Sequence, residues 1–350
     1  MESPIDMKDF EEKGQRLKDA EVCLITKQIP KIKEIYDALH VKYPESLGEL
    51  KVTDIKNYRN GRYILIENGG NPVYDYLMRI IPDMRGVAQP LYHFKSYDIA
   101  KKILETNSIQ VSDMMSNFDN DFAEYTEFFR RIGMVRPFTT GETPSIARGC
   151  YYDTEGKYLV DHWKQSIFIL CLTENGDEPK FWKEYGGDEN AEKVRLKMEF
   201  DLSNLPKTEG HELKVNFRKV CYDSGYKFDP ILELNNTLRL NVQLELEPKG
   251  FTRFSTFYKR KKYECEKETR LSLDFTDYSA SLKSYVDDLL KQYPVKMDKK
   301  RRYIDLSADS RYIKWKISEI TCSPSVTESH FNEIERLGKM HNPKMIIDRK

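Results

Sequence analysis

Three glutamates at every second position, Glu264, Glu266 and Glu268, are the residues of this 350-residue chain whose spacing most directly suggests chemistry. They lie in KKYECEKETRLSLDF, residues 261–275, where Arg270 continues the same parity. Side chains alternate across a strand, so one strand over this segment is predicted to carry the carboxylates on one face. Neighbouring like charges need water, cations or a catalytic task. Two interpretations stay open: a solvated outer face, or a strand lining a cleft in which neighbouring groups set the ionisation of a carboxylate.

The opposite parity of this segment supplies the apolar side chains that would anchor such a strand in a core. They are Tyr263, Cys265, Leu271, Leu273 and Phe275.

A second candidate is Tyr92-His93 in the short strand LYHF (91–94), which runs into an amphipathic helix over 96–107 and then a strand with Ser112. A histidine at a strand end before a helix start can donate to ribose or phosphate oxygens, and the helix N-terminus favours the same anions. The alternative is a structural histidine paired with backbone. Next along the chain, FDNDFAE (118–124) places Asn and Asp at a helix start, and N-capping is the favoured reading of these residues.

Two aromatic residues follow the apolar strand SIFILCLT (166–173) and a glycine-bearing turn. Trp182 and Tyr185 stand three residues apart, on one side of a helical turn, and could form a stacking floor for a planar ring. Packing into a core is the commoner role for such a pair.

The elements that must position these residues alternate between strands and helices. Alternating apolar residues predict strands over 194–202 and 238–246, and further strands are predicted at 302–307 and around RYIKWKISEITCS. Helices are predicted at 120–133, 281–293 and 328–340, with a loop at 135–150, and Ser325 with Glu328 fits a capping box for the last helix. The expected class is α+β, with a mixed, largely antiparallel sheet and flanking helices. Residues 1–85 are expected to form a mostly helical extension, with the main domain at 86–350.

Composition limits the classes of function. Lys+Arg and Asp+Glu are both 57, so net charge gives no signal for nucleic acid or acidic membranes. The start of the chain lacks the apolar region of a secretory signal, no apolar run is long enough for a membrane span, and the six cysteines show no CxxC spacing. We therefore expect a cytoplasmic protein with no membrane partner and no metal.

Taken in order, these segments resemble a bacterial family known as domain of unknown function 2971. The matching segments are Tyr92-His93-Phe94-Lys95-Ser96, Asn120-Asp121-Phe122-Ala123-Glu124, Cys171-Leu172-Thr173 with Trp182-Lys183-Glu184-Tyr185, and Tyr263 to Arg270. The resemblance covers about residues 91 to 348. The chain departs from the family pattern at Phe118, which stands one place early, at Tyr263 in place of tryptophan, and at Ser323 in place of glycine.

The family itself is similar to the ADP-ribosyltransferase fold, which implies a mixed, largely antiparallel split sheet with flanking helices. The resemblance implies that NAD is the substrate and that Glu268 or Glu266 is the catalytic carboxylate. It also implies that His93, with Tyr92 and Ser112, anchors the dinucleotide, that Trp182 and Tyr185 stack on a ring, and that Arg270 orients the glutamates or binds a phosphate. An ADP-ribosyltransferase or NAD glycohydrolase of a bacterial toxin or phage-defence type follows, with an acceptor of unknown identity.

Two other functions stay open. A ligand-sensing or partner-binding module could keep this fold without the chemistry. A metal-dependent nuclease using Glu264, Glu266 and Lys267 is weaker, because on a strand Lys267 would point away from the glutamates.

Overall fold

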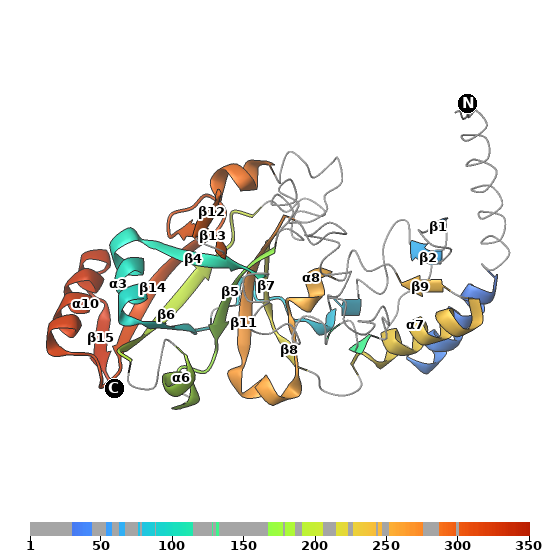
Figure 1. Ribbon diagram of the computed structural model, residues 1–350, viewed down its shortest axis with the longest axis horizontal. Helices are drawn as coiled ribbons and strands as arrows, with labels where there is room; N and C mark the ends of the chain where they lie inside the picture. Colours follow the sequence, from blue (N-terminus) through green and yellow to red (C-terminus); the bar gives the residue numbers. More distant parts are fainter. Residues whose placement is uncertain are drawn as a thin grey trace, which may run out of the picture. The chain divides into compact units, whose positions relative to one another are not determined.

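The chain forms two compact units in the computed structural model, and each unit is assembled from three segments (Figure 1). The first unit comprises Met1–Ile80, Tyr125–Cys150 and Asp223–Ser255; the second comprises Ile81–Glu124, Tyr151–Tyr222 and Thr256–Lys350. This division differs from the predicted boundary at 85/86, because the chain returns to the first unit twice after leaving it.

The structure describes most of the second unit and parts of the first. The described residues are 30–43, 54–57, 63–66, 76–77, 79–87, 89–114, 128, 131–132, 167–177, 179–185, 191–205, 215–222, 227–242, 244–246, 252–275, 287–298 and 301–350. The FDNDFAE segment, the loop at 135–150 and most of the predicted helix at 120–133 lie outside them, as does the start of the predicted helix at 281–293.

The described part of the second unit contains a ten-stranded sheet, in which every pairing is antiparallel except the one between its last two strands. The path through eight of its strands is β12-β13-β4-β5-β3-β6-β14-β15, and β11 pairs with β5 and β7 off this path. The strands are β3 (Leu91–Ser96), β4 (Ser108–Asp113), β5 (Ile167–Thr173), β6 (Lys193–Asp201), β7 (Val215–Lys219), β11 (Glu268–Asp274), β12 (Val295–Asp298), β13 (Arg301–Ser307), β14 (Lys314–Cys322) and β15 (Ile346–Arg349). The predicted α+β class with a largely antiparallel sheet is confirmed.

The sheet splits along one edge of β5. β11 pairs with β5 over its whole length, from Glu268 opposite Thr173 to Asp274 opposite Ile167. The two remaining partners, β3 and β4, must therefore share the other edge: β3 pairs only at Thr173, and β4 only at Phe168 and Ile169. Between these contacts, residues 170–172 of β5 have no strand partner on this edge among the described residues.

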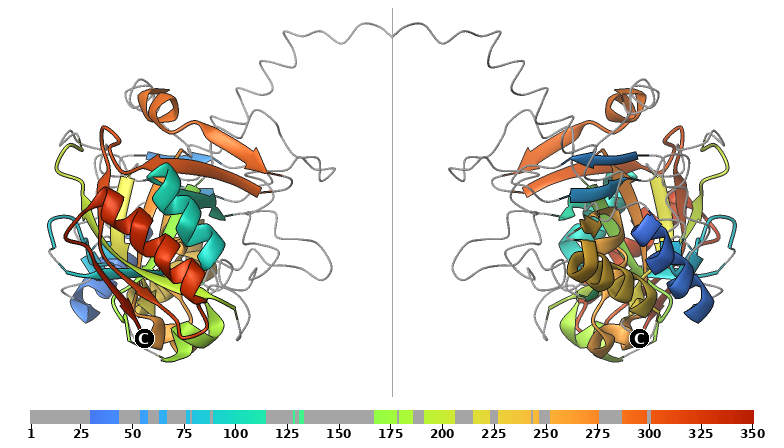
Figure 2. Two further views of the ribbon diagram at one scale, coloured as in Figure 1. Left: turned by 90° about the vertical axis from the view of Figure 1, so that its left-hand side faces the viewer. Right: turned by 90° about the vertical axis from the view of Figure 1, so that its right-hand side faces the viewer.

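Two helices cover the core of this unit. α3 (Tyr97–Thr106) connects β3 to β4, and α10 (Glu328–His341) lies beside it, as Figure 2 shows on the left. The apolar residues on one side of each helix belong to the same buried core as the strands. Burial of each leucine or isoleucine among them contributes about 1.5 to 3 kcal/mol. The core residues of the two helices include Ala100, Ile103, Leu104, Ile334 and Leu337.

The segment 261–275 is not one strand, and this prediction was wrong. Lys261–Glu266 forms a 3₁₀ turn, here η5, which ends at Lys267 in the left-handed conformation (φ 43°) before β11 begins. Cys265 is exposed, whereas Glu266 and Glu268 are buried, so the predicted inward and outward parities are reversed around the turn. All seven residues of β11 are buried, since the strand has a neighbour on each side and is covered on both faces.

Two further predictions were wrong in their local detail. Residues 238–242 belong to helix α7 (Asp229–Val242), and only Leu244–Leu246 form a strand, β9. The cap of α10 is Thr327, whose side chain accepts from the backbone N–H of His330 at 3.4 Å, rather than Ser325. Ser325 instead donates to the carbonyl oxygen of Ala191 at 2.9 Å.

The first unit is smaller in its described part. A helix over residues 30–42 contacts α7, where Lys42 and Tyr43 both donate to the Glu233 carboxylate at 2.6 and 2.8 Å. A separate sheet joins β1 (Asp54–Asn57), β2 (Tyr63–Ile66) and β9. No helix among the described residues is long and apolar enough to cross a membrane.

Candidate active site

Three of the predicted site segments meet in one row across three adjacent strands. Tyr92 of β3 stands opposite Thr173 of β5, and Thr173 stands opposite Glu268 of β11. The row lies at the place where β3 begins to leave β5. Tyr92 and Thr173 are 81 positions apart in the sequence, and Thr173 and Glu268 are 95 positions apart. The sheet holds all three residues within two strand spacings, about 10 Å.

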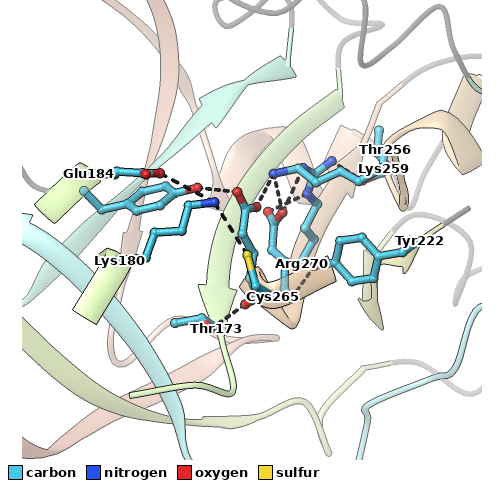
Figure 3. A network of polar contacts seen from close by, with 11 residues as sticks. Thr173, Lys180, Glu184, Tyr222, Thr256, Lys259, Cys265 and Arg270 are labelled. Atoms are coloured by element: carbon cyan, nitrogen blue, oxygen red, sulfur yellow. Dashed lines mark hydrogen bonds and ion pairs between the residues drawn. The ribbon is translucent and has the colours of Figure 1, made fainter. Parts of the chain in front are cut away.

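Glu268 is a buried carboxylate that remains ionised. Its oxygens accept from Arg270 Nε at 2.7 Å and Nη2 at 3.1 Å, and the Lys259 ammonium lies 2.8 Å from Oε2 (Figure 3). Burial alone would raise the pKa of Glu268, but Arg270 and Lys259 outweigh burial and lower this pKa to about 2. The carboxylate therefore carries its negative charge at neutral pH.

Glu266 lies close to Glu268 although the turn at Lys267 takes Glu266 off the strand. The Lys259 ammonium bridges the two glutamates, at 2.7 Å from Glu266 Oε2 and 2.8 Å from Glu268 Oε2. The Tyr185 hydroxyl donates to Glu266 Oε1 at 2.6 Å. Burial, reinforced by this hydrogen bond, raises the pKa of Tyr185, so the phenol keeps its proton and stays a donor.

Three residues of this cluster were not predicted: Lys259, Tyr222 and Thr256. Lys259 and Tyr222 are register partners in a two-stranded parallel sheet made of β8 (Cys221–Tyr222) and β10 (Tyr258–Lys259). The Tyr222 hydroxyl accepts from the Glu268 backbone N–H at 2.7 Å, and the Thr256 carbonyl accepts from Arg270 Nη1. The only sequence signal for Lys259 is its place just before the acidic segment.

His93 contacts the edge of β5 where residues 170–172 have no strand partner among the described residues. Its Nδ1 lies 3.0 Å from the Cys171 carbonyl oxygen, and this oxygen can only accept. Nδ1 therefore carries the proton. Burial, followed by the nearby Lys95 ammonium, lowers the pKa of His93 well below its usual value, so the ring is neutral and Nε2 is a bare acceptor. That nitrogen is buried and has no hydrogen-bond partner among the described residues.

Cys171 connects His93 to the glutamates. Its side chain is the one exposed position in β5, yet it sits among charged groups and donates a hydrogen bond to the Glu268 carboxylate. Desolvation by the surrounding protein, followed by the Glu268 charge, raises the pKa of this thiol to about 12. Cys171 is thus a neutral thiol at the point where the sheet opens.

The two predicted aromatics have different surroundings. Trp182, in the helix α6 (Pro179–Glu184), packs edge-on against Phe94 at 5.1 Å between ring centroids, and the Lys350 ammonium lies 5.2 Å from its ring. Tyr185 turns its hydroxyl to Glu266 and packs its ring against Phe181 at 5.2 Å. Tyr185 belongs to the carboxylate cluster, whereas Trp182 lies against β3 and does not form one floor with it.

Ser112 does not lie near the row of Tyr92, Thr173 and Glu268. Ser112 belongs to β4 and stands opposite Ile169 of β5. Ile169 is four residues from Thr173 along β5, a distance of roughly 13 Å. Arg270, in turn, is committed to Glu268 and to the Thr256 carbonyl, so its observed contacts orient the carboxylate.

Arg195 fixes the turn that leads into α6. Its Nη1 donates to the Gly176 carbonyl at 2.6 Å and to Asp177 at 2.8 Å, and its guanidinium lies 4.9 Å from the Tyr92 ring centroid. Gly176 touches the same ring, and a Cβ there would come within 2.7 Å of Tyr92 Cζ. Only glycine permits this approach, which holds the Tyr92 end of the row in place.

The acidic segment does not assemble as a metal-dependent nuclease would need. Glu264 is exposed while Glu266 is buried, and Glu266 pairs with Lys259. Across the described ranges, no group of three His, Cys, Asp or Glu side chains could hold a metal ion. Comparison with protein-family models, curated proteins and solved structures finds no significant match.

Proposed function

We propose that the protein cleaves the nicotinamide–ribose bond of NAD, as an ADP-ribosyltransferase or an NAD glycohydrolase, with Glu268 as the catalytic carboxylate. The observation that supports this most is the row of Tyr92, Thr173 and the ionised Glu268 at the split in the sheet, with His93 beside it. A preplaced anion is the group that this reaction needs.

The chemistry follows from the charge of the cluster. When the C1′–N bond breaks, its electron pair leaves with neutral nicotinamide, and positive charge develops on the ribose as an oxocarbenium ion. A carboxylate that is already desolvated and oriented stabilises that charge more in the transition state than in the substrate. Glu268 is oriented by Arg270, and in this proposal Glu266 accepts the proton of the attacking hydroxyl.

In this proposal Lys259 competes with the substrate for the Glu268 carboxylate. Its ammonium contacts both glutamates, so a ribose hydroxyl reaching Glu268 has to share or displace the Lys259 contact. The acceptor of the ADP-ribose, which can be a macromolecule, a small molecule or water, would enter on the Glu266 side.

A second candidate function, a ligand-sensing module without turnover, is favoured by one observation. Glu268 already accepts from Arg270 and Cys171 and contacts Lys259, which leaves little capacity for a ribose hydroxyl. Calorimetry separates the two functions: NAD binding without nicotinamide release supports a sensor.

The enzyme proposal is tested by measuring nicotinamide release from NAD by chromatography. The rates of the wild-type protein and of Glu268→Gln are compared. We expect the substitution to lower the rate by about 10³-fold, as for removal of a transition-state-stabilising group. Asp113→Asn is the matched control, because Asp113 is another buried carboxylate in the same sheet paired with an arginine, Arg302. Equal rates for the wild-type protein and the Glu268 variant would refute the assignment.

A further inference from the structure

A cavity of about 400 Å³ lies in the second unit, where α3 and α10 end beside the turn between β13 and β14. Its size is within the range of small-molecule sites, roughly 300 to 1,000 Å³. Three of its lining residues, Asp309, Lys316 and His341, are exposed, so the cavity opens to solvent. None of its lining residues belongs to the carboxylate cluster around Glu268.

The inner part of the cavity is apolar. The buried core residues that line it are Ile103, Leu104, Trp315, Ile317 and Met345. The indole N–H of Trp315 donates to the Leu306 carbonyl oxygen at 3.0 Å, so the polar atom of this ring is already satisfied. What these side chains offer to a ligand is therefore apolar surface and an aromatic ring.

Hydrogen bonds between the three walls hold the cavity open. The Ala308 amide of the β13–β14 turn donates to the carbonyl oxygen of Asn107, the C-cap of α3, at 3.0 Å. At the end of α10, His341 Nε2 donates to the Leu104 carbonyl oxygen of α3. Because the walls are joined to each other, a ligand does not have to order them, which lowers the cost of binding.

The unpaired formal charge in the cavity is negative. The Asp309 side chain makes no hydrogen bond or ion pair with any residue that the structure describes. Lys316 also lines the cavity, but its ammonium is paired with the Glu199 carboxylate at 2.8 Å. A carboxylate without a counter-charge, beside an apolar surface, favours an incoming cation.

The two helix ends add to this negative potential. The last carbonyl groups of a helix carry partial negative charge, and both α3 and α10 present their C-terminal residues to the cavity. α3 has no basic residue in its last turn. In the last turn of α10, the Lys339 ammonium is paired with Glu335, and His341 is bound to the Leu104 carbonyl.

We propose that this cavity binds a small organic amine, with its ammonium group at Asp309 and its apolar body against Trp315 and Met345. A metal ion is a poor occupant, since no group of three His, Cys, Asp or Glu side chains in the described ranges could hold one. Anions are disfavoured by the carboxylate and by the helix ends. The site is separate from the proposed NAD cleavage and does not depend on it.

The test compares three probes of similar shape and different charge: phenethylamine, 2-phenylethanol and 3-phenylpropionate. Binding is measured by calorimetry and by the change in tryptophan fluorescence, because Trp315 lines the cavity. Phenethylamine should bind at millimolar concentration, and the neutral and anionic probes about tenfold more weakly or not at all. Added salt should weaken the binding of phenethylamine.

Two variants locate the amine in the cavity. Asp309→Asn keeps the size of the side chain and removes its charge, so phenethylamine affinity should fall about tenfold. Asp298→Asn is the matched control, because Asp298 is another exposed aspartate with no side-chain partner in the described part of the chain, and it lies outside the cavity. Trp315→Phe should remove the fluorescence change. Melting temperatures check that each variant remains folded.

The outcomes do not involve nicotinamide release, so they are independent of the enzyme proposal. Phenethylamine binding that depends on Asp309 and not on Asp298 supports the site. Undetectable phenethylamine binding at millimolar concentration overturns it, as does equal affinity of the wild-type protein and Asp309→Asn. Equal affinity for 3-phenylpropionate overturns the preference for a cation, and a fluorescence change that persists in Trp315→Phe places the amine elsewhere.

Discussion

Replacing Glu268 by glutamine should change how the stability of the second unit depends on pH. The carboxylate is buried, and its pKa is held at about 2 against an ordinary value of 4.5, mainly by the Arg270 and Lys259 cations acting against burial. A carboxylate whose pKa is lower in the folded state contributes stability above its unfolded pKa and loses it as pH falls toward the folded pKa. Glutamine has no such titration.

The magnitude follows from the same two values. A difference of about 2.5 between them corresponds to roughly 3 kcal/mol of unfolding free energy at pH 7, at about 1.4 kcal/mol for each unit. At pH 3 the same linkage leaves about 1 kcal/mol, and at pH 2 less than about 0.5 kcal/mol. The wild-type protein should therefore exceed the variant in stability by an amount that shrinks below pH 4.5.

Urea unfolding followed by tryptophan fluorescence provides the measurement, because Trp182 and Trp315 both lie in the second unit. The quantity compared is the difference in unfolding free energy between the wild type and Glu268→Gln at pH 7 and at pH 3. Taking the difference removes the contribution of the other carboxylates. A difference that is the same at both pH values, or larger at pH 3, would refute the ion-pair reasoning.

Three further predictions concern the packing, capping and thiol chemistry of the second unit. Gly176→Ala should lower the unfolding free energy by about 1 to 3 kcal/mol in urea, because the new Cβ would be 2.7 Å from the Tyr92 ring; an unchanged midpoint would contradict this close approach. Thr327→Ala should cost about 1 kcal/mol in the same assay through loss of the α10 cap, and no loss would mean that the cap lies elsewhere. Cys265→Ser should remove one fast-reacting thiol in an Ellman assay at pH 8, whereas Cys171→Ser should not. Both side chains are exposed, but a pKa of about 12 leaves Cys171 only about 10⁻⁴ thiolate; loss of a fast phase in Cys171→Ser would contradict this.

Much of the second unit could be predicted because its periodicities are unambiguous. β6 alternates apolar and charged residues, α3 carries its apolar residues on one stripe, and β5 is apolar almost throughout. The sequence also singled out Glu268 and Glu266 as candidate carboxylates, in the last of an ordered set of segments. The contact of Lys259 with Glu268 and that of Tyr185 with Glu266 were not predictable, because these residues come from elements whose pairing only the folded chain reveals.

The failures arose where two periods coexist in one segment. Alternate apolar residues at 238–246 suggested a strand, yet Ile231, Leu234, Leu238 and Val242 also have helical spacing, and the Asp-Pro start at 229–230 marks a helix N-terminus. Leu240, which the strand reading would bury, is 79% exposed. At 261–267 the sequence does alternate as a strand would, but the left-handed conformation of Lys267 ends a turn that keeps Glu266 off the strand. Residue propensities for strand or helix do not indicate that turn.

The turn at Lys267 means that the two glutamates are subject to different constraints on insertion and deletion. Glu268 is fixed by the register of β11 between β5 and β7, so a change in its position would have to shift two strands at once. Glu266 belongs to a short turn before the strand, joined to the end of β5 by hydrogen bonds from Thr173 to the Glu266 carbonyl at 2.6 Å and from the Glu174 amide to the Lys267 carbonyl at 3.1 Å. A residue gained or lost there would change these two bonds and leave the β11 register in place. Descendants of this chain could thus keep one carboxylate unchanged while relocating the other, and the spacing between the two acidic residues would be the variable part of the site.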